Sequence, residues 1–136
     1  MKSLLITDAL NSSMIDKDIT EKIIAAAMRI HTRVGPGLLE SAYRDFLYYE
    51  LLREGWAVEK EKQMPVVYEG LSLEYGYRID LLVDNKVVVE LKTVELLRQV
   101  HQQQVLTYLR MGNFKTGLLI NFQVAHLKDG LKRISN

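Results

Sequence analysis

Residues 77–92 read YRIDLLVDNKVVVELK, and the pattern of this stretch decides the fold. Two runs rich in valine, leucine and isoleucine, at 77–83 and 87–92, flank Asp84-Asn85-Lys86, where aspartate and asparagine are typical turn residues. Apolar runs of this length, bounded by turn residues, indicate two strands, and the short polar segment between them indicates a hairpin. We therefore expect an antiparallel pair that is joined at residues 84–86.

The length of the loop determines which side chains of this hairpin oppose each other, because directly opposed residues lie on the same face. A three-residue loop, or a bulge with the same result, opposes apolar residues throughout. The resulting pairs are Ile79 with Leu91, Leu81 with Val89 and Val83 with Val87. A two-residue turn would mix apolar and charged side chains, so we predict the three-residue register. On the other face this register sets Asp80 opposite Glu90 and Arg78 opposite Lys92.

Two directly opposed carboxylates, with Cβ atoms about 4.5–5.5 Å apart, repel each other and cost stability. A hard divalent cation between Asp80 and Glu90 would remove that cost, because carboxylate oxygens are its natural ligands. Lys92 projects from the same face as Glu90 and could orient or deprotonate a water molecule, or stabilise developing negative charge. The alternative is a solvated sheet face on which Arg78 and Lys92 neutralise the two acids.

The rest of the chain predicts a single α/β or α+β domain over residues 1–136, with elements in the order α-α-β-β-β-β-α-β. Residues 1–16 are expected to be a loosely ordered lead-in. A capping box, Asp18-Ile-Thr-Glu21, is expected to open the first helix and Gly35 to end it, after which Pro36 opens the second helix. The further elements are a helix at 38–54, an edge strand at 56–63, a hairpin or meander at 66–73, a helix at 95–111, a strand at 116–121 and a final strand within 127–134.

The second predicted helix is expected to bury one apolar stripe. Its members are Leu39, Ala42, Tyr43, Phe46, Leu47 and Leu51. Glu40 lies at the border of this stripe, where a buried carboxylate needs a partner and a boundary salt bridge is the alternative. Pro65 excludes a central strand at its position, because proline cannot donate to a neighbouring strand.

Composition limits the functions that the chain can have. The net charge of +1 gives no electrostatic argument for nucleic-acid binding, so such a function depends on the site itself. There is no cysteine, which suits a reducing cytoplasm, and we expect a cytoplasmic protein. No apolar run is long enough to span a bilayer, so we expect no membrane partner. The edge strand near Val58 and the apolar segment 118–120 leave a homodimer open.

Three segments resemble motifs of known families. Asp80, followed after a gap by Glu90-Leu91-Lys92, resembles the core motif of the PD-(D/E)xK nuclease superfamily, with Ile79 where the motif's proline would stand. Gln104-Val-Leu-Thr-Tyr108 is similar to the Q-x-x-x-Y motif of the RecB-like branch. Gly37-Leu-Leu-Glu40-Ser-Ala-Tyr43, preceded by Gly35-Pro36, is similar to the signature of the small bacterial GxxExxY proteins. The resemblance covers residues 18–123.

The resemblance implies a restriction-endonuclease-like core, with a mixed β-sheet flanked by helices, and a nuclease activity on DNA or RNA that requires Mg²⁺ or Mn²⁺. It implies that Asp80, Glu90 and the backbone carbonyl of Leu91 bind the metal, that Glu40 completes the site and that Lys92 assists the water. It also implies a substrate cleft, lined by Gln104, Tyr108, Tyr43 and Gly37. Two alternatives remain: a non-catalytic module that binds nucleic acid or protein, and a metal-dependent phosphoesterase for small phosphates.

Glu40 links the named signature to this chemistry. If the second helix crosses the face that carries Asp80 and Glu90, the Glu40 carboxylate comes within roughly 8 Å of both, near enough to reach one metal directly or through water. His101, one helical turn before Gln104, could join the same cleft. A lone histidine is more often structural or solvated, so we assign it no role.

Overall fold

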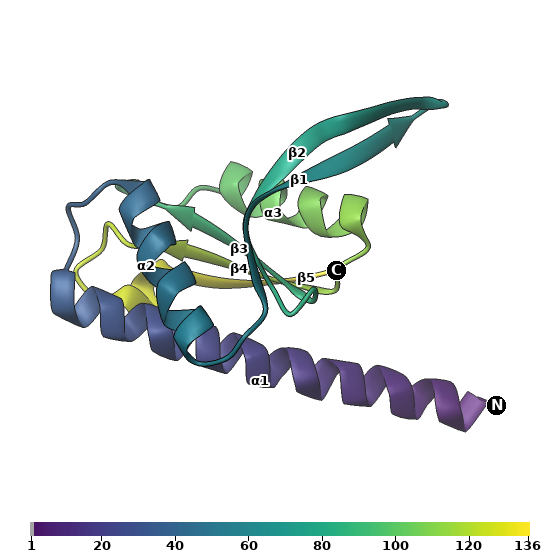
Figure 1. Cartoon of the computed structure of the whole chain (residues 1–136), viewed down its shortest axis with the longest axis horizontal. Coiled ribbons are helices and arrows are strands. Elements are labelled where there is room, and N and C mark those ends of the chain that lie inside the picture. Colours follow the sequence, from purple (N-terminus) through teal and green to yellow (C-terminus); the bar gives the residue numbers. More distant parts are fainter. Residues whose placement is uncertain (1) are drawn as a thin grey trace.

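The computed structural model describes the backbone of residues 2–136 and the side chains of residues 16–136. Helices cover both faces of a five-stranded mixed sheet, an α+β arrangement of the restriction-endonuclease-like type (Figure 1). The helices are α1 (Lys2–Val34), α2 (Glu40–Arg53), α3 (Gln99–Gly112) and the short 3-10 helix η1 (Leu127–Gly130). The strands are β1 (Val58–Tyr68), β2 (Leu71–Val83), β3 (Val87–Lys92), β4 (Thr116–Asn121) and β5 (Leu131–Ser135). The strands lie in chain order, with β3 and β4 parallel and the other neighbours antiparallel.

Helix α1 begins at Lys2, so the prediction of a lead-in over residues 1–16 and of a helix start at Asp18 is wrong for the residues described. A capping box favours a helix start but does not prevent a helix from passing through it. No glycine or proline precedes Gly35, so nothing in the sequence interrupts the helix earlier. Gly35 adopts a left-handed φ of 67° and its N–H donates to the carbonyl of His31, which confirms the predicted helix end.

Helix α2 begins at Glu40, and Pro36 lies in the loop before it rather than at its first turn. The helix buries Tyr43, Leu47 and Leu51, which follow each other at intervals of one turn. Leu39 is 76% exposed and Phe46 is 39% exposed, so the predicted stripe is wrong at these two positions. Leu39 precedes the helix, and Phe46 lies one position off the Tyr43–Leu47 row, so neither faces the core.

Strands β1 and β2 form one long hairpin that projects from the body of the molecule (Figure 1). The sequence predicted an edge strand at 56–63, a hairpin or meander at 66–73 and a separate strand at 77–83. The structure instead accommodates Pro65 at an irregularity in the pairing between Met64 and Val66. Because β1 is the edge strand, Pro65 costs no central ladder bond, which confirms that it is not in a central strand. We call the part of this hairpin from Val66 to Leu73 the distal arm.

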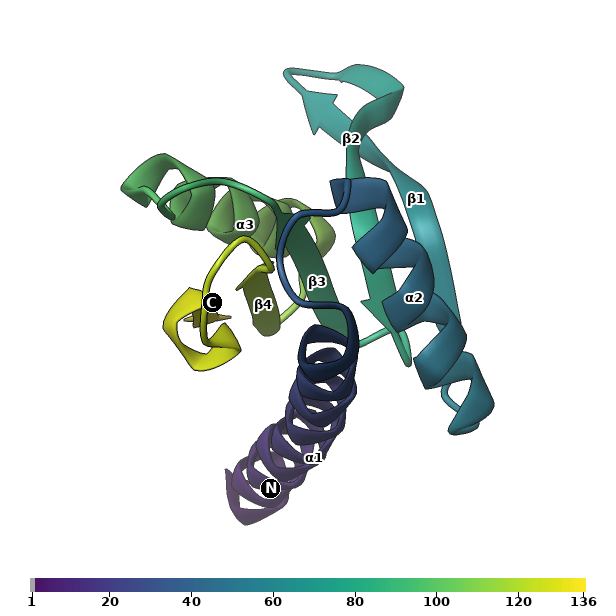
Figure 2. The ribbon, with the colours of Figure 1, turned by 90° about the vertical axis from the view of Figure 1, so that its left-hand side faces the viewer.

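Two hydrophobic cores lie on opposite faces of the sheet, with α1 and α2 over one face and α3 over the other (Figure 2). Leu81 and Val89 belong to the first core, and Leu82 and Val88 to the second, as strand alternation requires. Ile79 packs on the α3 side with Leu82, so the prediction that it shares a face with Leu81 is wrong. The alternation breaks at the intervening residue, Asp80.

The C-terminal half follows the predicted order with shifted boundaries. Helix α3 begins four residues later than predicted and ends at Gly112, where the next residue, Asn113, caps it with a left-handed φ of 58°. Strand β4 matches residues 116–121, and the weakly indicated last strand is present as β5, after η1. Over the described residues, no helix has the length and apolar character that crossing a bilayer requires.

Candidate active site

The β2–β3 hairpin has the predicted register at residues 81–83 and 87–89, but the predicted pairing of Ile79 with Leu91 is wrong, because these side chains lie in cores on opposite faces of the sheet. Leu81 pairs with Val89, Leu82 with Val88 and Val83 with Val87, which leaves a three-residue loop. Asp84 and Asn85 in this loop have φ of 56° and 54°, a left-handed conformation that these two residue types tolerate. Local sequence chemistry therefore sets the register that brings Asp80 and Glu90 together.

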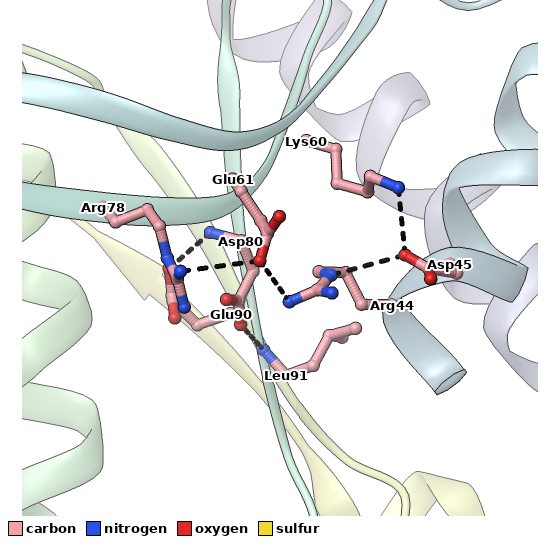
Figure 3. A network of polar contacts seen from close by, with 8 residues as sticks. All are labelled: Arg44, Asp45, Lys60, Glu61, Arg78, Asp80, Glu90 and Leu91. Atoms are coloured by element: carbon pink, nitrogen blue, oxygen red, sulfur yellow. Dashed lines mark hydrogen bonds and ion pairs between the residues drawn. The ribbon is translucent and has the colours of Figure 1, made fainter. Parts of the chain in front are cut away.

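Asp80 and Glu90 meet where the backbone ladder of this hairpin ends. The Asp80 N–H donates to Glu90 Oε1 at 3.0 Å, and the Leu91 N–H donates to Asp80 Oδ2 at 2.9 Å (Figure 3). Each carboxylate thus accepts a backbone N–H of the opposite strand. Asp80 is 6% exposed and Glu90 is 4% exposed. The two acids are buried and held in fixed orientation, which is unusual for a solvated sheet face.

Burial beside Asp80 shifts the titration of Glu90. Burial, and next the charge of Asp80, raises the pKa of Glu90 from its ordinary 4.5 to about 9, against smaller opposing effects from the Asp80 N–H and from Lys92. Glu90 therefore carries a proton at neutral pH unless a cation approaches the pair. Burying two acids that repel each other lowers stability. Because stability does not explain the pair, it is a candidate for function.

Glu40 and Lys92 complete the electrostatic surroundings. Burial, and next the charge of Asp80, raises the pKa of Glu40, while the charges of Lys92, Arg44 and Arg78 lower it. Lys92 acts in the same direction on Glu90, so its ammonium group is near both acids. Among the side chains at 16–136, Lys92 takes part in no salt bridge. Its charge is thus available to a ligand.

Helix α3 brings Gln104 and Tyr108 toward the same acids. Burial, and then the charges of Glu90 and Asp80, raises the pKa of Tyr108, while the nearby Gln104 side chain lowers it. Gln104 Oε1 is buried and has no hydrogen-bond partner in the part of the chain whose side chains are described. Tyr77 stacks on Tyr108 with ring centroids 4.6 Å apart and donates to its carbonyl oxygen at 3.1 Å. Tyr77 therefore fixes Tyr108 through two contacts, one with its ring and one with its backbone.

A family model described as the PD-(D/E)XK nuclease superfamily matches residues 17–134 of this chain. The chain belongs to this superfamily. Comparisons with curated proteins and with solved structures gave no match. PD-(D/E)XK proteins are usually hydrolytic nucleases and generally use divalent metals, so the superfamily supports a nuclease-type function in which nucleic acid is bound.

The paired acids of this PD-(D/E)XK domain supply donors that fit a small divalent cation. Asp80 and Glu90 each commit one oxygen to a backbone N–H and keep a second oxygen that makes no such bond. Within residues 16–136, no three His, Asp or Glu side chains gather closely enough to hold one metal ion. The donor set therefore fits a cation held by two carboxylates and otherwise by water or backbone carbonyls, as is common for Mg²⁺. Glu40 as a third ligand remains a prediction.

The signature that contains Glu40 has a clear structural basis. Tyr43 is fully buried and stacks on Phe122 at 4.4 Å. Its hydroxyl donates to the Gly35 carbonyl at 2.6 Å and accepts from the Leu38 N–H at 3.1 Å, so it holds both ends of the loop before α2. Tyr43 therefore fixes the start of the helix that carries Glu40. Its contacts are with this loop and with Phe122 rather than with a cleft.

Gly37 belongs to the same loop. Its φ of 116° favours glycine, and its N–H donates to Gln123 Oε1 at 3.2 Å. This contact joins the loop to the chain just after β4. The structure thus gives Gly37 a role in positioning, while the predicted cleft role of Gly37 and Tyr43 has no contact that supports it.

Asn121 is a positioning residue that the sequence reasoning missed. It is buried at the end of β4, directly beside Lys92 in the parallel pair. Its amide donates to the Val94 carbonyl at 2.8 Å and its Oδ1 accepts from the Val94 N–H at 3.1 Å. Asn121 therefore fixes the chain just after Lys92. The only signal in the sequence was a polar residue that ends an apolar strand.

Two other expectations are settled by contacts. His101 Nδ1 accepts from the Arg98 N–H at 3.0 Å, so His101 caps α3. Arg78 Nη1 lies 3.4 Å from Glu61 Oε1 on β1 and forms no salt bridge with Asp80 or Glu90. The alternative of a solvated sheet face is therefore not supported, because Asp80 and Glu90 are buried and form no salt bridge with Arg78 or Lys92.

Proposed function

We propose that this chain is a Mg²⁺- or Mn²⁺-dependent nuclease that hydrolyses phosphodiester bonds, and that it is a GxxExxY protein. The observation that carries the proposal is the buried, backbone-oriented pair of Asp80 and Glu90. Among the side chains of residues 16–136, no Lys, Arg or His forms a salt bridge with either acid, although burial and repulsion raise the pKa of Glu90 to about 9. Carboxylates in this arrangement suit a divalent cation, and a cation beside Lys92 suits a phosphate.

Each residue has a distinct role in this proposal. Asp80 and Glu90 hold the cation through their second oxygens, and the Leu91 carbonyl is a further donor. When bound, the cation polarises a phosphoryl oxygen and lowers the pKa of coordinated water. Lys92 orients the attacking water or stabilises negative charge on the phosphoryl group. Glu40, whose pKa the charge of Asp80 raises, would bind the cation directly or through water, and Gln104 and Tyr108 would contact the substrate from α3.

A cleavage assay with a matched control tests the proposal. The purified protein is incubated with labelled single-stranded DNA, double-stranded DNA and RNA, in Mg²⁺, in Mn²⁺ and in a chelator. We expect metal-dependent cleavage of at least one substrate, and its loss in Lys92→Ala. Lys86→Ala is the control, because it removes an exposed lysine of the β2–β3 loop and leaves the paired acids intact.

The outcomes separate the functions. Equal cleavage by Lys92→Ala and the wild type would mean that a contaminant or another site is responsible. Binding of nucleic acid without cleavage in either metal would favour the non-catalytic module. Cleavage of small phosphate esters but of no polymer would favour the phosphoesterase.

A further inference from the structure

Glu61 has an unusual backbone beside the candidate active site. It lies in β1 with a left-handed φ of 52°, which is uncommon for a residue other than glycine and costs energy. Its neighbours Lys60 and Lys62 pair with Leu81 and Ile79 of β2, so Glu61 stands across from Asp80, where the β1–β2 pairing is interrupted. Strain at this position requires a compensating contact or a function.

Two arginines from different elements converge on the carboxylate of Glu61. Arg44 of α2 places Nη1 at 2.9 Å from Glu61 Oε1, and Arg78 of β2 places Nη1 at 3.4 Å from the same oxygen (Figure 3). The Arg44 side chain is 15% exposed and the Arg78 side chain is 50% exposed. One carboxylate oxygen therefore holds together two guanidinium groups that the fold brings from either side.

The surrounding charges leave this cluster with an excess of positive charge. Asp45 contacts Arg44 Nε at 3.5 Å and Lys60 Nζ at 3.2 Å. Three cations, from Arg44, Arg78 and Lys60, thus share two carboxylates. Counted without the neighbouring acids Glu40 and Asp80, the cluster carries one excess positive charge, which attracts an anion.

The cluster adjoins the candidate active site on both sides of the paired acids. The charges of Arg44 and Arg78 lower the pKa of Glu40 on α2. The charge of Arg78 also lowers the pKa of Tyr108 on α3. Arg78 therefore lies near candidate-site residues of both α2 and α3, two positions before Asp80 in β2.

We propose that Arg44 and Arg78 bind a backbone phosphate of the nucleic-acid substrate, and that Glu61 occupies this site as a substitute anion until the phosphate displaces it. The inference rests on the proposed nuclease function and assigns substrate contacts to it. Arginine recognises carboxylate and phosphate oxygens with the same fork of N–H donors, so one group can replace the other. Displacement is inexpensive, because partly exposed salt bridges contribute little and the strained Glu61 backbone can relax.

The test is a binding measurement that does not depend on cleavage. A Lys92→Ala background blocks cleavage, and fluorescence anisotropy gives the Kd of a labelled oligonucleotide in Mg²⁺ over a range of salt concentrations. Adding Glu61→Gln removes the competing anion, and we expect binding about fivefold tighter. Adding Arg78→Gln is expected to weaken binding about fivefold and to reduce the salt slope by about 1.

Matched controls use charges of the same elements. Glu59→Gln removes the exposed β1 carboxylate that pairs with Lys62, and Arg53→Gln removes an exposed arginine at the far end of α2. Neither control variant should change the Kd or the salt dependence of binding by more than the small effect expected from any change in net charge. If Glu61→Gln folds poorly, Glu61→Gly also removes the carboxylate, and glycine suits the left-handed backbone there.

Three results would overturn the inference in different ways. Unchanged or weaker binding by folded Glu61→Gln and Glu61→Gly proteins would show that the cluster is structural only, while nucleic-acid binding by the background protein keeps the nuclease proposal. Displacement of the oligonucleotide from the Glu61→Gln protein by millimolar inorganic phosphate would assign the site to free phosphate. No binding of any oligonucleotide by the background protein would overturn both the inference and the proposed function.

Discussion

Glu90→Gln is predicted to make the metal-free protein more stable at neutral and higher pH. The folded protein raises the pKa of Glu90 to about 9, whereas the unfolded chain restores about 4.5, so the folded state binds more protons between these values. Stability therefore falls as pH rises above the unfolded value and stops falling near the folded one. Between the unfolded pKa of about 4.5 and pH 7, a span of about 2.5 pH units, the free energy of unfolding of the wild type falls by about 3 kcal/mol. Glutamine carries no charge and keeps an oxygen that can accept the Asp80 N–H.

The assay is denaturant unfolding in a chelator, at about pH 5 and about pH 8, for the wild type and Glu90→Gln. The quantity of interest is the difference in unfolding free energy between the two proteins, since groups away from the paired acids titrate equally in both. This difference should favour Glu90→Gln increasingly toward high pH. Glu74→Gln is the control, because Glu74 is an exposed carboxylate on β2, and it should track the wild type. A difference that is the same at both pH values would refute the buried, repelled state of Glu90.

Three further predictions concern the same site. Mg²⁺ or Mn²⁺ should raise the melting temperature of the wild type by several degrees, because a ligand of the folded state stabilises it, and Asp80→Asn and Glu90→Gln should lose this response; equal responses in all three proteins would contradict the site. Glu40→Gln should abolish cleavage while the melting temperature stays near that of the wild type, and full activity would confine the site to the β2–β3 hairpin. Tyr43→Phe should lower the unfolding free energy by about 1–3 kcal/mol, since it leaves buried partners of the hydroxyl unsatisfied, and should reduce cleavage through Glu40; an unchanged stability would show that the loop holds itself.

The β2–β3 hairpin was predictable because its determinants are local. Strand periodicity and the length of the Asp84–Lys86 loop are enough to place Asp80 opposite Glu90, and both can be read from one short stretch. The start of α1 was not predictable from Asp18, because a capping signal gives no information on whether the helix continues past it. Pro65 suggested a break, but tolerance of proline depends on which strand lies at the sheet edge, which is a tertiary property.

The site shows the same division between local and distant determinants. Asp80, Glu90 and Lys92 are close in sequence and were found through their pattern. Glu61, Arg44 and Asn121 reach the site through the packing of separate elements, and no spacing relates them. Residues that position a site from a distance give only a weak signal in the sequence, such as a polar residue in an apolar strand. Their roles are therefore visible only in three-dimensional contacts.

The distal arm has a stability of its own. From Val66 to Leu73 the two strands pair only with each other, since β3 joins β2 only at Leu81–Val83. Tyr68 and Leu71 are exposed there, so little apolar burial holds the tip. A two-stranded hairpin without a packed face is marginal in water. Backbone amides of the distal arm should therefore exchange with solvent through local opening, while those of β3 exchange only when the body unfolds. The molecule thus has two thermodynamic units within one sheet, and the candidate active site lies near their junction.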